Sequence, residues 1–165
     1  MSRAFVNEEL AAEQADTPVE RRVSEQPNYV TVQGLAQLQQ RVSELNALRT
    51  ALQAQGEQAD KQRLADSERD LRYFTARLQS AQVVPRASAT DKVQIGSRVT
   101  YLDEQNQQHE VQLVGEDQAD AGHGLINWGS PLGRALLGAA PGDVVLWRRP
   151  AGDQSIEIVA ITPEA

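Results

Sequence analysis

Two series of apolar residues at helical spacing, one on each side of Gly56, constrain the fold more than any other feature of the sequence. The first comprises Leu35, Leu38, Val42, Leu45 and then Leu48 or Leu52, and the second comprises Leu64, Leu71, Phe74 and Leu78. Steps of three and four residues place each series on one face of a helix. No proline lies between Tyr29 and Val84. The pattern therefore predicts two amphipathic helices, the first beginning after Thr31 as N-cap.

The two helices share a consistent antiparallel register. Folding the chain back near Gly56 matches apolar residues with apolar residues: Leu35 with Leu78, Val42 with Leu71, and Leu48 with Leu64. Glycine readily adopts the left-handed conformation that closes a helix, and each arm then has about 25 residues, or ~37 Å. A single helix through Gly56 is the alternative, since one glycine costs only about 1 kcal/mol in a helix. Such a helix would need a partner chain to cover its apolar face.

The segments around this hairpin (30–83) differ from it in composition. Residues 1–29 are polar, contain Pro18 and Pro27, and show no sustained period, so we expect a flexible acidic extension. Residues 84–92 contain Pro85 and small polar residues and are interpreted as a linker. Residues 93–165 change to a period of two, with short β-branched runs separated by turn residues, which predicts an antiparallel sheet. These runs lie at 92–102, 109–115, 124–129, 143–150 and 155–161.

One short helix is predicted within the sheet region. Ser130 is suited to the N-cap and Pro131 to the first helical position, and Gly138 can close the C-terminus. Three leucines would then face the sheet: Leu132, Leu136 and Leu137. The sequence predicts an α+β fold with a helical hairpin followed by a β-rich domain.

Composition excludes several classes of site. The chain has no cysteine, so disulfides, thiolate metal sites and thiol nucleophiles are excluded, and the two histidines, His109 and His123, do not suggest a metal pair. No stretch approaches the ~18 apolar residues of a membrane span, so we expect a soluble, cytoplasmic protein. The formal charge of −7 argues against nonspecific binding to duplex DNA, and only residues 31–90 are net basic.

The order of these parts resembles that of a known family. The stretch "NWGSPLGRALLGAAPGDVVLWRRPAGDQSIEIVAI" is similar to the C-terminal signature of the bacterial GreA/GreB transcript cleavage factors, and "TVQGLAQLQQRVSEL" and "LQSAQVV" resemble the two ends of their coiled-coil hairpin. The likeness covers about residues 30–162. It implies an FKBP-like C-terminal domain that docks at the rim of the RNA polymerase secondary channel, with the hairpin inserted toward the catalytic centre.

The resemblance also implies which residues contact RNA polymerase. The Ser-Pro loop and the helix after it form much of the docking surface in the family, so the candidates here are Gly129, Ser130, Pro131, Arg134 and Leu136. Gly129 departs from the family, where this position is often polar or acidic. The lost side-chain contact would weaken docking.

The hairpin tip departs further from the family. In Gre factors an acidic pair at the tip is thought to hold a Mg²⁺ ion for RNA hydrolysis, and Gly56, Glu57 and Asp60 fall on the family's Gly, Asp and Glu with the two acids exchanged. Lys61 and Gln62 replace the Asn-Ala that follows in the family. The favoured interpretation is that Glu57 and Asp60 are ordinary acidic residues at a helix start. Both arms also look about one heptad, ~10 Å, shorter than the family pattern.

Several arginines and lysines on the hairpin are candidates for contact with nascent RNA inside the polymerase, chiefly Arg49, Lys61 and Arg63. The alternative is an ordinary solvated helix face, because acidic residues such as Asp66 and Asp70 are mixed with them.

These observations favour a monomeric RNA polymerase-binding regulator of elongation that is not itself an enzyme. We expect no tightly bound cofactor, with Mg²⁺ relevant only in the polymerase complex, and neither a membrane nor a small-molecule substrate. A true cleavage factor, with Glu57 and Asp60 sharing a polymerase Mg²⁺, is the main alternative. A prolyl isomerase is disfavoured because the C-terminal region offers only Tyr101, Trp128 and Trp147 as aromatic walls. An adaptor for another protein is the third alternative.

Overall fold

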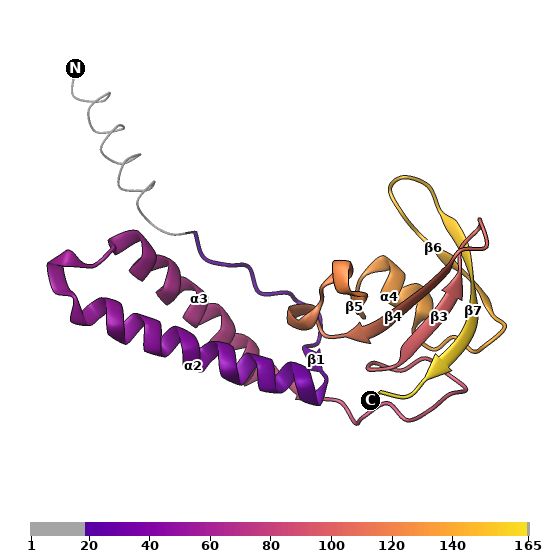
Figure 1. Cartoon of the computed structure of the whole chain (residues 1–165), viewed down its shortest axis with the longest axis horizontal. Helices are drawn as coiled ribbons and strands as arrows, with labels where there is room; N and C mark the ends of the chain where they lie inside the picture. The colour runs from indigo at the N-terminus through magenta and orange to yellow at the C-terminus, as the bar shows by residue number, and fades with distance from the viewer. Residues whose placement is uncertain (1–18, 165) are drawn as a thin grey trace, which may run out of the picture. The chain divides into compact units, whose positions relative to one another are not determined.

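The computed structural model describes residues 19–164, which form two compact units of an α+β fold (Figure 1). The first unit contains residues 40–79 together with 19–24, and the second contains 25–39 and 80–164. Two of the boundaries, after Gln39 and after Gln79, fall within the predicted hairpin, and the third, after Ser24, falls within the predicted extension. No helix in residues 19–164 has the length and apolar character that crossing a membrane requires.

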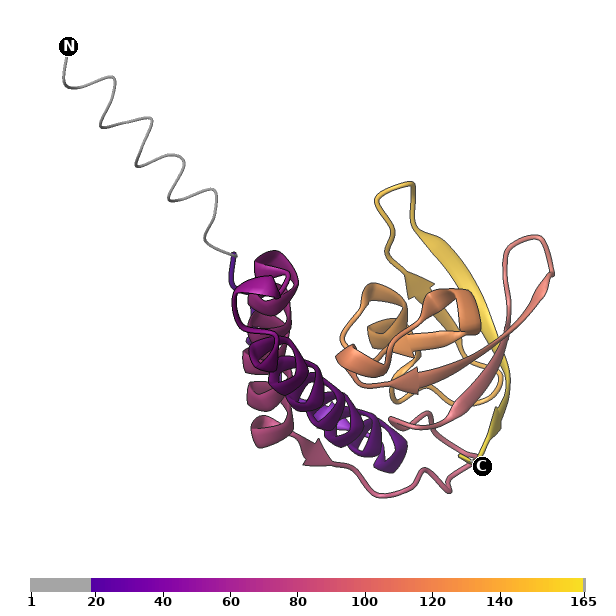
Figure 2. The ribbon, with the colours of Figure 1, turned by 60° about the vertical axis from the view of Figure 1, so that its left-hand side comes forward.

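The predicted helical hairpin is confirmed. Helix α2 spans Val32–Ala54 and helix α3 spans Lys61–Ser80, and Figure 2 shows them side by side. Gly56 lies between them with φ of +60°, in the left-handed region, and begins the short 3₁₀ helix Gly56–Gln58. The alternative of one unbroken helix is wrong.

Thr31 caps α2 as expected, because its Oγ1 accepts a hydrogen bond from Gly34 N at 3.0 Å. The same hydroxyl donates to Gln118 Oε1 at 2.7 Å in a buried contact that links residues far apart in sequence. A Cβ at Gly34 would lie 2.8 Å from that Gln118 oxygen. The start of α2 thus belongs to the second unit through specific polar contacts.

The main sheet has the strand order β5-β4-β3-β7-β6. Its strands are β3 (Arg98–Leu102), β4 (Gln108–Val114), β5 (Leu125–Asn127), β6 (Val144–Trp147) and β7 (Gln154–Thr162). All neighbours pair antiparallel except β4 and β5, which are parallel, so the prediction of a wholly antiparallel sheet is wrong at this edge. Between β4 and β5 the chain forms two 3₁₀ turns, Glu116–Gln118 and Ala121–His123, and this longer connection allows β5 to return in the same direction.

The hydrophobic core lies between this sheet and the short helix α4 (Pro131–Leu136). Val99, Leu113 and Ile158 have no exposed surface, and Leu132 and Leu136 from α4 pack into the same cluster. Leu137 was expected to face the sheet but is 39% exposed, because α4 ends at Leu136. Gly138 follows with φ of +83°, which agrees with its predicted role in closing the helix.

The end of the predicted flexible extension contacts the folded units, and a strand begins at its last residue, Tyr29. Strand β1 (Tyr29–Val30) pairs parallel with β2 (Gln82–Val83), a two-stranded sheet that was not predicted. Asn28 and Val30 are buried, and Asn28 Nδ2 donates to Ser80 Oγ at 3.1 Å. Residues 1–18 of the predicted extension lie outside the described residues.

Candidate functional site

The Ser130–Pro131 corner is built by hydrogen bonds that end β5 and begin α4. Ser130 Oγ accepts from Gly133 N at 3.1 Å, which makes Ser130 the N-cap, and it donates to Asn127 O at 2.7 Å. Asn127 Oδ1 also accepts from Gly129 N at 2.9 Å. Asn127 was missed by sequence reasoning, although an asparagine two residues before a glycine is a common turn signal. The corner is therefore held rigidly by its own side chains.

Close backbone packing fixes α4 against the corner. A Cβ at Gly133 would lie 2.2 Å from Asn127 O and 2.6 Å from Trp128 O, so no side chain fits at this position. The helix start cannot shift away without disturbing Leu132, which is buried in the core. Pro131 and Arg134 are exposed on the outer side of α4.

The segment that precedes α2 packs against the corner at Trp128 and Gly129. The ring of Tyr29 lies 5.3 Å from that of Trp128 at an angle of 58°, and a Cβ at Gly129 would come within 2.1 Å of Gln26 Oε1. The absent side chain at Gly129, predicted to weaken docking, thus leaves room for a residue of the same chain. Residues 25–30 support the corner from within the second unit.

Pro131 lies between two concave surfaces of the second unit. One is about 550 Å³ and includes Tyr101, Ile126 and Trp147 in its walls, and the other is about 410 Å³ and is lined by Arg134, Leu146 and Arg148 among others. Burial raises the pKa of Tyr101, with a further contribution from Asp103. An exposed proline flanked by apolar hollows and arginines suits protein binding.

The structure divides the five predicted polymerase-contacting residues. Gly129, Ser130, Pro131 and Arg134 lie together at the corner, where each is exposed or half-buried. Leu136 has no exposed surface and packs in the core, so its prediction as a contact residue is wrong. The reason is helical spacing, because Leu136 is four residues after Leu132 and shares its inward face.

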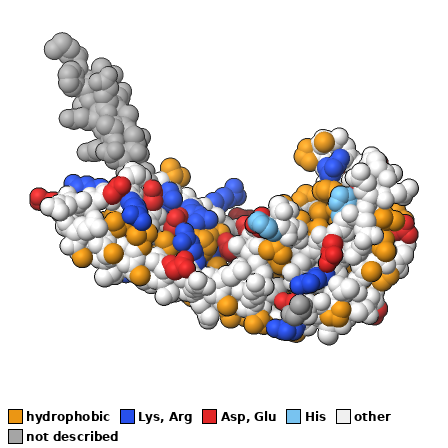
Figure 3. Space-filling model, in the orientation of Figure 1, with side chains coloured by type: hydrophobic (Ala, Val, Ile, Leu, Met, Phe, Trp, Pro, Cys, Tyr) orange, Lys and Arg blue, Asp and Glu red, His pale blue; other side chains and the backbone are white. Residues whose placement is uncertain are grey.

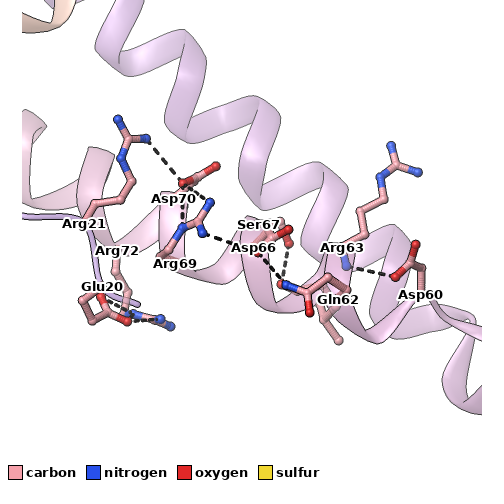
Figure 4. A network of polar contacts seen from close by, with 11 residues as sticks. Glu20, Arg21, Asp60, Gln62, Arg63, Asp66, Ser67, Arg69, Asp70 and Arg72 are labelled. Atoms are coloured by element: carbon pink, nitrogen blue, oxygen red, sulfur yellow. Dashed lines mark hydrogen bonds and ion pairs between the residues drawn. The ribbon is translucent and has the colours of Figure 1, made fainter. Parts of the chain in front are cut away.

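At the hairpin tip, Asp60 has a structural role. Its Oδ1 accepts from Arg63 N at 3.0 Å and its carbonyl oxygen accepts from Leu64 N at 2.9 Å, so Asp60 is the N-cap of α3. Figure 4 shows this bond, with the Arg63 guanidinium pointing away from the carboxylate. Glu57 is exposed on the preceding 3₁₀ turn. Within residues 19–164 no group of three or more His, Asp or Glu side chains is placed to hold a metal ion.

The predicted nucleic-acid contacts do not form one basic cluster. Lys61 and Arg63 are exposed in the first turn of α3, whereas Arg49 is half-buried on α2 and donates to Asn46 Oδ1 at 3.1 Å. Figure 3 shows Lys and Arg side chains interspersed with Asp and Glu over the hairpin. Asp66 and Asp70 each lie within ion-pair distance of Arg69. Contact with nascent RNA stays a prediction.

Comparison with known proteins identifies the C-terminal part of the chain. Residues 88–163 match the family described as "Transcription elongation factor, GreA/GreB, C-term". The chain is 37% identical over 103 residues to the transcription elongation factor GreB of Neisseria meningitidis serogroup B, covering 61% of this chain and 63% of that protein. It is 36% identical over 92 residues to GreA of Cereibacter sphaeroides, covering 55% and 59% of the two proteins.

Among solved structures, GreA factor homolog 1 (Gfh1) of Thermus thermophilus is similar at 22% identity and a TM-score of 0.40, covering 82% of this chain and 99% of that one. The match to the curated relatives spans about three fifths of their length. The family match to residues 88–163 includes the Ser130–Pro131 corner. The chain is thus similar to the GreA/GreB factors over its C-terminal part, residues 88–163.

Proposed function

We propose that this chain is a transcription elongation factor that binds RNA polymerase through its Ser130–Pro131 corner. The proposal is supported by the match of residues 88–163 to the GreA/GreB C-terminal domain and by relatives named as transcription elongation factors. The geometry that supports the contact is the rigid, capped start of α4, which holds Pro131 and Arg134 in fixed positions on the surface. A preorganised surface binds without an entropic cost for ordering the loop.

In this proposal the hairpin enters the polymerase secondary channel and modulates elongation without stimulating efficient transcript cleavage. The observation that carries this part is the Asp60 cap. Asp60 Oδ1 already accepts Arg63 N, which leaves only Oδ2 without a bond for Mg²⁺, and the ammonium of Lys61 next to the carboxylate opposes a bound cation. The predicted shortening of the hairpin would also leave the tip short of the catalytic centre.

The chain would act through the polymerase and would not be a catalyst by itself. If Mg²⁺ were shared at the tip, Glu57 and Asp60 would be the residues to hold it, and the metal would supply an activated water for RNA hydrolysis. Glu57 is exposed and its carboxylate forms no bond within the described residues, which is the one observation that favours the cleavage alternative.

A stalled, backtracked elongation complex separates the two functions. We expect the purified chain, tested over a range of Mg²⁺ concentrations, to release no short RNA and to compete with a cleavage-competent Gre factor for the polymerase. RNA release that is lost in Glu57→Ala and kept in Gln58→Ala would establish cleavage instead. Gln58 is the matched control because it is the next exposed residue of the same turn.

A further inference from the structure

Residues Val19–Ser24, here called the strap, lie against helix α3 (Figure 4). Arg72 Nε donates to both carboxylate oxygens of Glu20, at 3.1 and 3.2 Å, and Arg72 Nη2 also pairs with Glu20. The next strap residue, Arg21, places Nη1 3.4 Å from Asp70 Oδ1. Each of these two adjacent strap residues thus forms an ion pair with an α3 residue of opposite charge.

The strap also makes aromatic contacts. The guanidinium carbon of Arg21 lies 3.9 Å from the ring centroid of Tyr73 and 5.0 Å from that of Phe74. The two rings pack edge to face with centroids 5.0 Å apart, and Tyr73 is only 8% exposed. Arg21 therefore covers an aromatic pair on the hairpin, an arrangement that fixes its guanidinium in place.

The strap lies at the margin of a groove in the hairpin. Arg72 lines a hollow of about 740 Å³ between α2 and α3, with Val42 and Leu71 among its apolar walls. Arg49 also lines it, and its Nε is buried without a hydrogen-bond partner. Displacement of the strap would therefore expose aromatic and cationic groups of α3 beside an apolar groove.

The contacts between the strap and α3 are individually weak, so the strap can leave the helix. Exposed ion pairs each change an equilibrium by about fivefold at most, and salt screens them. The hydrogen bond from Arg72 lowers the pKa of Glu20, which extends the charged range of the carboxylate toward acidic pH. The strap is held by several weak contacts, and a competing surface can displace it.

We propose that the strap is an autoinhibitory contact, which holds the Arg72–Tyr73 face of α3 in the free protein and must leave that face when the hairpin enters RNA polymerase. This inference rests on the proposed function for its target. It explains why an acidic and a basic residue are adjacent in the strap. Glu20 forms an ion pair with Arg72, and Arg21 forms one with Asp70, on the face that the strap covers.

Strap docking is tested first in the free protein, by trypsin cleavage after Arg21. Trypsin needs the guanidinium of Arg21 in its own pocket, so the bond is cut only when Arg21 leaves Tyr73. We expect cleavage after Arg21 to accelerate at least threefold in Arg72→Gln with Asp70→Asn, and in wild-type protein at high salt. These changes leave the strap sequence intact. Arg63→Gln is the control, because its side chain contacts no strap residue. Equal cleavage rates in all variants would overturn docking.

Inhibition is tested by the affinity of the full chain for RNA polymerase. We expect Glu20→Ala with Arg21→Ala to bind three- to tenfold more tightly than wild type, and Arg22→Ala, the neighbouring exposed arginine, to bind like wild type. Equal affinity of the double variant and wild type would overturn the autoinhibitory role. If no variant binds polymerase, both the inhibitory role and the proposed function fail. Trypsin protection would still show the strap docked in that case, so the two failures are distinguishable.

Discussion

At Gly133 the main chain of α4 passes so close to the preceding loop that the backbone atoms of this loop leave no room for a side chain. The two nearest atoms to a Cβ there are the carbonyl oxygens of Asn127 and Trp128, which cannot rotate away as a side chain could. The same loop carries Ser130 and Pro131. The requirement for glycine at 133 is thus a requirement of the candidate docking site.

Gly133→Ala should therefore destabilise the chain. We expect a loss of about 1–3 kcal/mol in the free energy of unfolding from overpacking, despite the gain of about 1 kcal/mol that alanine brings to a free helix. Urea unfolding measures it. Gly122→Ala is the control, because its Cβ would meet only Asp120 Oδ1 at 3.6 Å. Equal stability of the two variants would contradict the close approach.

Asp60 offers a way to separate capping from charge. Asp60→Asn keeps an oxygen that can accept Arg63 N, whereas Asp60→Ala removes it and should cost about 1 kcal/mol of stability. We expect Asn to unfold close to wild type and Ala to unfold earlier in a thermal melt. If Asn and Ala destabilised equally, the carboxylate charge and not the cap would explain Asp60.

Asp103 makes the turn between β3 and β4 sensitive to acid. The hydrogen bond with His109 Nε2 at 2.8 Å, followed by the backbone N–H of Gln107, holds the pKa of Asp103 below its usual value. A lowered carboxyl pKa stabilises the fold above the unfolded-state pKa, and this stabilisation is lost as the pH falls through the folded-state pKa. The turn should therefore weaken only in acid.

We expect Asp103→Asn to lose less unfolding free energy than wild type as the pH falls below the ordinary Asp pKa of about 4 and through the lower pKa of Asp103 in the folded state. Denaturant unfolding at a series of pH values measures the difference. Asp153→Asn, in the exposed turn between β6 and β7, should keep the wild-type pH dependence. Identical profiles for wild type and Asp103→Asn would rule out this account of the turn.

The helices and most strands were predictable because their signals are local. Helical spacing on both sides of Gly56 predicted α2 and α3, and the capping residues Thr31 and Ser130 were identified from residue type alone. The parallel pairing of β4 with β5 and of β1 with β2 was not predictable, because it depends on contacts between distant segments. The same holds for the strap, since no periodicity marks Glu20 and Arg21 as partners of α3.

The candidate site was predictable in its position but not in all its members. Ser130 and Pro131 carry a local capping signal, and the structure places them at a rigid corner. Leu136 was wrongly included because a signature in the sequence does not tell surface from core. The support that Gln26 and Tyr29 give to the corner comes from about a hundred residues away in sequence and leaves no local pattern.

The turn at Gly56 gives the sharpest test of the hairpin. A Cβ there would have open space around it, so the whole cost of a substitution comes from its φ of +60°. We expect Gly56→Ala to lose about 1–2 kcal/mol of stability, and Gly56→Asn to lose less because asparagine tolerates this conformation. Thermal unfolding monitored by helix content measures both. Equal losses would indicate that backbone strain is not the cause.

The whole chain combines a hairpin unit of mixed charge with a β-rich unit that carries the family signature. Residues 31–90 are net basic and residues 91–165 are net acidic, although the chain as a whole has a formal charge of −7. The likeness to the GreA/GreB factors lies in the second unit, where residues 88–163 match the GreA/GreB C-terminal domain. The central claim for function is therefore that the corner in this unit binds RNA polymerase, and we expect the free chain to be a monomer.

The most direct test is the affinity of the full chain for purified bacterial RNA polymerase, measured for wild type, Pro131→Ala and Pro150→Ala. Both prolines are exposed in the same unit, but only Pro131 lies at the corner. The account predicts binding by wild type, about tenfold weaker binding by Pro131→Ala, as for a contact at the centre of an interface, and no change in Pro150→Ala. Absence of binding, or equal binding by all three proteins, would contradict it.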